Sequence, residues 1–237
     1  MSNAPAPDPL AVNQFKEVAA HAAVEQLEDG MVVGLGSGTT AALAVSAIGR
    51  RVQKGLRIIG IPTSEQTAGL ARSLGIVLST LGDCARVDIT IDGADEVEIG
   101  TLHLIKGGGG NLLREKIVAA SSARLVIVAD QGKLVHRLGS QAKVPVEVVP
   151  FGWQATANRL SRSGTDPVLR LGAGGERFLT DGRHYILDCF YGPIADPLAL
   201  QTELDGTIGV VEHGLFLGLA SEAFIGGLEG VARLRRG

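Results

Sequence analysis

The sequence predicts an α/β protein, and two observations lead to this fold class. Short runs of β-branched and other apolar residues alternate with longer helical stretches over residues 15–129. Such alternation is typical of a mainly parallel sheet with helices on both faces, in the Rossmann-like manner. Residues 141–214 have a different order of strand-like and helix-like segments. This β-α-β-β-α-β order predicts a smaller ferredoxin-like α+β domain.

The first part of the chain is expected to alternate between the two kinds of element, apart from two consecutive strands at 87–91 and 102–105. The run at 125–129 is continuously apolar, which is typical of a strand buried on both faces, whereas 87–91 alternates apolar and polar residues. We expect helices at 15–27, 39–53, 64–74 and 112–121, and strands at 31–35, 56–61, 87–91, 102–105 and 125–129.

The second part carries a hairpin signal, Asp181-Gly182-Arg183, between two strand-like runs. We expect strands at 143–149, 167–171, 177–180, 184–189 and 209–217, and helices at 153–161 and 196–204. The predicted domains are a flexible leader at 1–10, a Rossmann-like catalytic domain at 11–140 and 215–237, and a small α+β domain at 141–214. The leader has three prolines and lacks the apolar run of a signal peptide.

Composition and charge exclude several functional classes. The chain of 237 residues is 45% hydrophobic and 20% charged, with a net charge of −3 and no block of like charges, so neither nucleic acid nor a membrane is an expected partner. Cys84 and Cys189 have no partner spacing, and the five histidines are scattered, so we expect no metal and no disulfide scaffold. A cytoplasmic protein is the default expectation.

Glycine makes up 33 of the 237 residues, about twice the average share. Many of these glycines gather where predicted strands end, in four turns that also carry acidic, basic or hydroxyl side chains. In an open parallel sheet, ligands bind outside the carboxyl ends of the strands, so four such turns predict one site. The turns are Gly34–Thr40, Asp92–Glu96, Lys106–Gly110 and Asp130–Lys133.

The first of these turns leads directly into a helix and predicts a phosphate site. Backbone N–H groups at a helix N-terminus attract anions, and the hydroxyls of Ser37, Thr39 and Thr40 add donors. The sequence supports a nucleotide-binding site less well. Walker A requires a lysine that is missing here, and the G-x-G-x-x-A match of 36–41 lacks the acidic residue expected after the second strand.

Four charged residues are candidates for proton chemistry. Asp92 and Asp95 follow a predicted strand, where they would either cap the turn or accept and move protons at sugar hydroxyls. Lys106 precedes four glycines, which would let a ligand reach both backbone and ammonium. Glu115 lies in the first turn of a helix beside Val118 and Ala119, a partly apolar setting that would raise the pKa of a carboxyl toward that of a useful base.

Taken together, these motifs closely resemble those of the ribose-5-phosphate isomerase type A family, from about residue 15 to residue 227. Beyond the glycine turns, the resemblance includes Arg114-Glu115-Lys116, Pro150-Phe151-Gly152-Trp153 and Ile186-Leu187-Asp188. Ser37 and Thr39 exchange the family's frequent threonine and serine, which retains both hydroxyls.

The resemblance implies an aldose–ketose isomerase of the non-oxidative pentose phosphate pathway, which interconverts D-ribose 5-phosphate and D-ribulose 5-phosphate without cofactor. It implies a homodimer, or a tetramer, with Glu115 as the base, and Asp92, Asp95 and Lys106 as further catalytic residues. The implied substrate contacts are Ser37, Gly38, Thr39, Thr40, Asp92, Gly93, Ala94, Asp95, Lys106, Gly107, Gly108, Gly109 and Lys133. A phosphosugar-binding sensor without turnover is the alternative.

Overall fold

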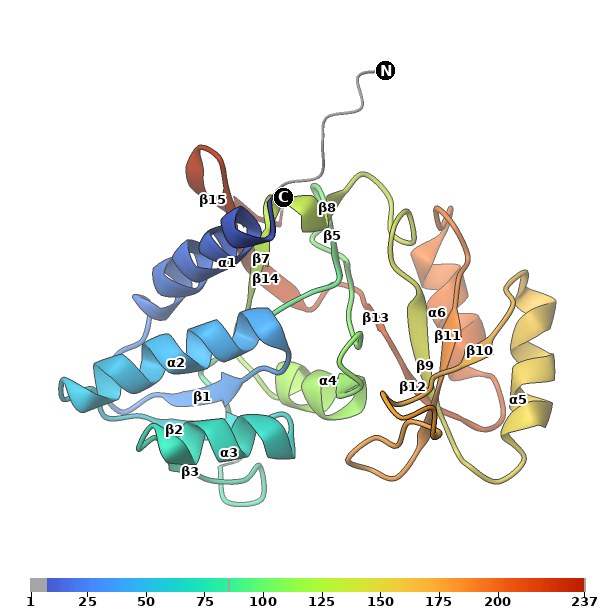
Figure 1. Ribbon diagram of the computed structural model, residues 1–237, viewed down its shortest axis with the longest axis horizontal. Helices are drawn as coiled ribbons and strands as arrows, with labels where there is room; N and C mark the ends of the chain where they lie inside the picture. Colours follow the sequence, from blue (N-terminus) through green and yellow to red (C-terminus); the bar gives the residue numbers. More distant parts are fainter. Residues whose placement is uncertain (1–7, 85, 237) are drawn as a thin grey trace.

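The computed structural model describes residues 8–84 and 86–236, and its centre is a sheet of seven strands (Figure 1). The strand order is β15-β14-β7-β4-β1-β2-β3, and all neighbours run parallel except β14 and β15. The mainly parallel α/β sheet expected from the sequence is therefore confirmed. Its strands are β1 (Val32–Leu35), β2 (Ile59–Pro62), β3 (Val77–Leu78), β4 (Ile89–Asp92), β7 (Leu125–Asp130), β14 (Ala220–Gly227) and β15 (Gly230–Arg235).

Each face of this sheet buries alternate residues of the same strands. In β7 all six residues are buried, with Val126 and Val128 in one apolar cluster and Leu125, Ile127 and Ala129 in another, as the period of two in a strand requires. The first cluster lies under α1 (Pro9–Val24), α2 (Thr39–Gln53) and α3 (Glu65–Ser73). The opposite face is covered by α4 (Leu112–Ala120) and by a second sheet.

The second sheet takes a strand that the alternation assigned to the main one. Its order is β13-β6-β5-β8, formed by β5 (Glu96–Glu98), β6 (Leu104–Ile105), β8 (Leu134–Val135) and β13 (Leu215–Phe216). The strand expected at 102–105 is therefore only β6, which pairs with β5 and β13. Two residues are too short for a central parallel strand, and Lys106 consequently approaches the site from a separate layer.

The expected strand at 209–217 also divides. It forms β12 (Val210–His213) and β13, which belong to different sheets. The break falls at Gly214, where an added Cβ would lie 2.3 Å from the carbonyl oxygen of Lys106. Only glycine lets the two backbones approach so closely, and the chain turns there from one sheet into the other.

The ferredoxin-like arrangement is present in the second half (Figure 1). Its elements are β9 (Val144–Val148), α5 (Trp153–Leu160), β10 (Val168–Leu169), β11 (Tyr185–Cys189), α6 (Pro197–Asp205) and β12. The strand order is β10-β11-β9-β12, and every pair is antiparallel. The strand expected at 177–180 is reduced to one bridge, because a turn at Gly172–Glu176 leaves Arg177 paired only with Leu171. We propose the boundaries 141 and 214 for this unit, which has an apolar cluster of its own.

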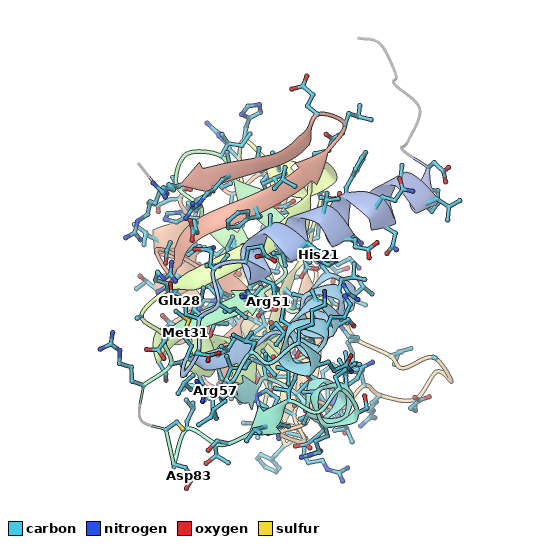
Figure 2. All side chains as sticks on the ribbon, turned by 90° about the vertical axis from the view of Figure 1, so that its left-hand side faces the viewer. His21, Glu28, Met31, Arg51, Arg57 and Asp83 are labelled. Carbon is cyan, nitrogen blue, oxygen red and sulfur yellow. The ribbon has the colours of Figure 1, made fainter. Side chains whose placement is uncertain are left out.

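Helix α1 begins six residues earlier than the periodicity predicted. Pro9 occupies its first turn and the Asp8 carboxylate accepts a hydrogen bond from Leu10 N–H, so residues of the expected leader at 1–10 are already helical. Residues 1–7 lie outside the described part. Arg51 Nη1 of α2 donates to the Val24 carbonyl of α1 at 2.5 Å and joins the two helices; Arg51 is labelled in Figure 2. Among the helices of residues 8–84 and 86–236, none has the length and apolarity to cross a membrane.

Candidate active site

A cavity of about 330 Å³ lies at the carboxyl edge of the main sheet and collects almost all of the predicted site residues. The residues predicted from the sequence that line it are Ser37, Gly38, Thr39, Thr40, Gly93, Ala94, Asp95, Lys106, Gly107, Gly108, Gly109, Glu115 and Lys133. Asp92 is the exception, since it lies behind Lys106 with 1% of its surface exposed. Lys16 of α1 also lines the cavity.

Sequence reasoning missed Lys16. It lies 18 residues before the nearest predicted motif, the turn Gly34–Thr40, and the packing of α1 against α2 brings it to the site. Its pattern is that of an ordinary solvated lysine on a helix, so the sequence held no signal for it. The cavity thus has two lysines, Lys16 and Lys133, near the end of α2.

The N-terminus of α2 forms one end of the cavity. Gly38 is its N-cap residue with φ +90°, and no side chain caps the helix, so its first N–H groups remain free for an anion. The preceding Gly36 allows the turn to pass close to Asp92, because a Cβ there would lie 2.1 Å from Asp92 Oδ1. This end of the cavity therefore suits a phosphate group.

The Ser37 hydroxyl was predicted as a hydrogen-bond donor to phosphate, but in the structure it contacts another side chain. Its Oγ lies 2.6 Å from Thr63 Oγ1, and Thr63 in turn donates to the carbonyl of Leu35 at 3.0 Å. Because the single hydroxyl proton of Thr63 is used in that bond, Ser37 must be the donor to Thr63. The Ser37 hydroxyl therefore holds the loop onto the sheet, and Thr39 and Thr40 are the hydroxyls left for a ligand.

Beside this turn, the site holds one ammonium between two carboxylates. Lys106 Nζ lies 2.9 Å from Asp92 Oδ2 and 3.2 Å from Glu115 Oε2, and it donates to the Gly93 carbonyl at 2.6 Å. Asp92 Oδ1 accepts from the N–H groups of Ser37 and Gly93. Glu115 Oε2 is buried and faces Lys106 Nζ as an ion pair, without an aligned hydrogen bond to any described residue.

Burial controls the charges of this cluster. It raises the pKa of Glu115 to about 8, with the Lys106 charge opposing and the Asp92 charge adding to the shift. Burial likewise raises the pKa of Asp92, against the ammonium of Lys106. Burial alone would lower the pKa of Lys106, but the charges of Asp92 and Glu115 outweigh it and leave the ammonium protonated. The raised pKa expected for Glu115 is thus confirmed.

Asp95 and the glycine turn form another part of the cavity wall. Asp95 Oδ2 accepts from the Gly108 N–H at 2.8 Å, and the Asp95 N–H donates to the carbonyl of Ile105 at the end of β6. The second carboxylate oxygen of Asp95 accepts no hydrogen bond from the residues that the structure describes, which fits the orienting role that the sequence suggested.

One group outside the cavity has the composition of a metal site: Asp205, Glu212 and His213. The side-chain atoms that would bind a metal already make hydrogen bonds within the protein. His213 Nδ1 accepts from Leu215 N–H, so its Nε2 carries the proton and donates to Asp205 at 3.0 Å. Glu212 Oε1 accepts from Lys116 Nζ. Burial and the nearby Lys116 charge lower the pKa of His213. The group fits a structural hydrogen-bond cluster and not a cation site.

An uncapped helix N-terminus flanked by lysines, facing a buried carboxylate with a raised pKa, is typical of an enzyme that holds a phosphorylated substrate and moves a proton. The comparisons agree. The sequence pattern of the family Ribose 5-phosphate isomerase A (phosphoriboisomerase A) matches residues 59–230. The chain belongs to the ribose 5-phosphate isomerase A family.

Curated relatives and solved structures cover nearly the whole chain. The chain is 57% identical to "Ribose-5-phosphate isomerase A" of Synechococcus sp. over 94% of this chain and 98% of that protein, and 60% identical to that of Gloeobacter violaceus over 91% and 94%. The structure of ribose 5-phosphate isomerase A from Methanocaldococcus jannaschii is similar with a TM-score of 0.90 and 41% identity over 94% of this chain and 99% of that one. A D-ribose-5-phosphate isomerase in complex with phospho-erythronic acid has a TM-score of 0.92 and 36% identity over 95% and 99%. A sensor without turnover is not favoured.

Proposed function

We propose that this chain interconverts D-ribose 5-phosphate and D-ribulose 5-phosphate through a cis-enediolate, with Glu115 carrying the proton between C2 and C1. The observation that carries this proposal is the Glu115 carboxylate. It lines the cavity, burial raises its pKa to about 8, and it lies 3.2 Å from the ammonium of Lys106. A base with these properties suits the removal of a weakly acidic proton from carbon.

The reaction starts from the open-chain aldose. Glu115 removes the proton from C2, and the electron pair of that C–H bond forms the C1=C2 double bond while the C1 carbonyl oxygen becomes negative. The proton on O2 passes to O1, and Glu115 returns its proton to C1, which gives the ketose. One base must reach both carbons, and the position of Glu115 between Lys106 and the glycine turn supports that role.

The developing negative oxygen needs donors that are already in place. Lys106 is anchored by Asp92, by the Gly93 carbonyl and by Glu115, so its positive charge is held at a fixed place in the cavity lining. The N–H of Gly109 in the glycine turn is a second donor at the same wall. Both are held by the fold before substrate binds, which keeps the reorganisation cost of the reaction low.

The phosphate would bind at the end of α2, between Thr39, Thr40, Lys16 and Lys133. Binding energy at this remote group would position C1 and C2 at Glu115. Asp95, with one free oxygen, would orient hydroxyls. The role of Asp92 in ring opening stays a prediction, because both of its oxygens already bind Ser37, Gly93 and Lys106.

The test follows ribose 5-phosphate and free ribose by proton NMR with the purified chain and without added nucleotide. We expect the C1 resonances of ribose 5-phosphate to approach an equilibrium mixture with ribulose 5-phosphate, while ribose stays almost unchanged. Binding of ribose 5-phosphate without any conversion would contradict the proposal and favour the sensor.

A cytoplasmic location and a homodimer also belong to this proposal. Apolar surface on the smaller unit supports association, since Phe151 is 94% exposed and Ile208 is 74% exposed. The Val149 N–H donates to the Gly209 carbonyl, which brings these two segments together at one end of that unit. Light scattering on the purified chain should give a mass of two chains or a multiple of two, and a monomer would contradict it.

A further inference from the structure

Arg170 joins the smaller unit to the wall of the cavity. It directly follows β10, and only 14% of its side chain is exposed. Its Nη1 donates to the carbonyls of Gly107 at 2.9 Å and Gly108 at 3.0 Å. Asp188 of β11 binds the other side of the guanidinium, with Nε at 3.0 Å from its Oδ2 and Nη2 on its Oδ1. The two residues form a bidentate pair that fixes the guanidinium plane.

The glycine turn bound by Arg170 includes a backbone N–H without a partner among the described residues, at a residue that lines the cavity. The Gly110 N–H donates to the Gly107 carbonyl and closes the turn, and the Gly108 N–H donates to Asp95. Within residues 8–84 and 86–236 the Gly109 N–H makes no hydrogen bond, although Gly109 lines the cavity. A run of four glycines has few conformational restraints of its own, so an outside contact must hold this N–H in place.

The contact to Arg170 also acts on the strength of that donor. The carbonyl of Gly108 belongs to the same peptide group as the Gly109 N–H. A carbonyl that accepts a bond from a cation polarises its peptide group, and the N–H on the other side becomes a better donor. The guanidinium therefore both aligns and strengthens the Gly109 N–H, from behind the wall and without reaching the cavity contents itself.

Resting on the proposed function, we propose that Arg170, held by Asp188, is a positioning residue for the isomerisation: it fixes the Gly107–Gly109 turn so that the Gly109 N–H meets the negative oxygen of the enediolate. The smaller unit then contributes to the rate of the reaction through this pair. Because the oxygen becomes negative only during proton transfer, the contribution falls on kcat more than on KM.

The first experiment measures kcat and KM for ribose 5-phosphate with Arg170→Lys. Lysine keeps the charge but cannot bind two carbonyls and two carboxylate oxygens at once. Complete removal of an oxyanion donor costs about 10²–10³-fold in kcat, so we expect misalignment to cost at least about tenfold, with KM within about threefold of wild type. Arg177→Lys is the matched control. It changes an exposed arginine of the same hairpin, stacked on Tyr185, and should leave both constants unchanged.

A second readout separates alignment from general loosening. Phospho-erythronic acid carries a planar, charged carboxylate that resembles the enediolate as well as a phosphate, whereas inorganic phosphate probes only the proposed phosphate site at the end of α2. Arg170→Lys should weaken the acid at least about fivefold more than inorganic phosphate in calorimetric titrations. Equal weakening of the two probes, or a loss confined to KM, would overturn the proposal.

If Arg170→Lys fails to fold, Asp188→Asn tests the same proposal. This variant keeps the size of the side chain and removes the charge that fixes the guanidinium, and we expect the same kcat-weighted loss in smaller degree. Wild-type kinetics for Asp188→Asn would overturn the proposal. A wild-type chain that does not isomerise ribose 5-phosphate would instead contradict the proposed function, so the two failures are distinguishable.

Discussion

Glu115 Oε2 lies 3.2 Å from Lys106 Nζ, and the two side chains are almost completely buried. The same ammonium contacts Asp92 Oδ2 at 2.9 Å. Two carboxylates therefore share one cation away from water, and they cannot both ionise as readily as in solution. This arrangement keeps a proton near Glu115 at neutral pH and makes the activity of the site dependent on pH.

The pH profile of the isomerisation should report Glu115 directly. Since the base must be ionised and its pKa is about 8, log kcat/KM for ribose 5-phosphate should rise with a slope of about one below pH 8 and level off above it. Initial rates between pH 5.5 and 9.5 check this. A flat profile across that range, or one that falls as pH rises toward 8, would contradict the assignment.

Asp92→Asn should move this midpoint to lower pH. The negative charge of Asp92 raises the pKa of Glu115, and its effect is larger than that of Asp95. Removing it leaves Lys106 as the nearest charge, which favours the ionised base. Profiles of the residual kcat/KM should therefore shift further toward acid in Asp92→Asn than in the matched Asp95→Asn. A midpoint at or above the wild-type value would refute the coupling.

Lys106→Met should destabilise the fold strongly. It leaves two buried carboxyl groups without their cation, a change that costs about 3–5 kcal/mol for a broken buried pair. The loss should be larger at pH 8.5 than at pH 6, because protonation removes the uncompensated charge. Urea unfolding at both values measures it, with the exposed Lys54→Met as control. A loss within about 0.5 kcal/mol of the control would show that Lys106 does not balance these groups.

Lys16→Ala and Lys133→Ala should weaken phosphate binding without changing the proton transfer. Each removes a cation beside the uncapped end of α2, so we expect KM for ribose 5-phosphate to rise roughly tenfold while kcat changes much less. Free ribose should remain a very poor substrate of the wild type. Similar kcat/KM values for ribose and ribose 5-phosphate would exclude a phosphate site at this helix.

Local pattern was sufficient for much of this site. Each glycine turn and each charged residue around Glu115 carries its signal within a few residues, and the α2 range 39–53 followed from periodicity alone. The family resemblance then combined these signals into one reaction. Contacts between distant segments carried no such signal. Lys16 reaches the cavity because α1 packs on α2, and Arg170 reaches the glycine turn because the smaller unit lies against it.

The differences between the predicted and the observed fold also arise from contacts between segments that are distant in the sequence. The alternation of strands and helices placed 102–105 in the main sheet, since it cannot distinguish a short strand of a second layer from a central one. Likewise the pattern of 209–217 was interpreted as one strand, which the approach of Gly214 to the Lys106 carbonyl divides in two. Ser37 was predicted to donate a hydrogen bond to a phosphate. Its partner in the structure, Thr63, lies 26 residues away, so the local sequence gave no sign of that contact.

The central claim is that Glu115 moves the proton, and Glu115→Gln in deuterated water tests it most directly. Glutamine keeps the size of the side chain and removes the base. We expect a loss of at least about a thousandfold in kcat, no incorporation of deuterium at C2 of ribose 5-phosphate, and unchanged binding of inorganic phosphate. The variant should melt no lower than wild type at pH 8.5, because the stability that Glu115 contributes below pH 4.5 is lost as pH rises through 8. Glu65→Gln, an exposed change on α3, is the control. Near-normal kcat with continued deuterium incorporation at C2 would contradict the account.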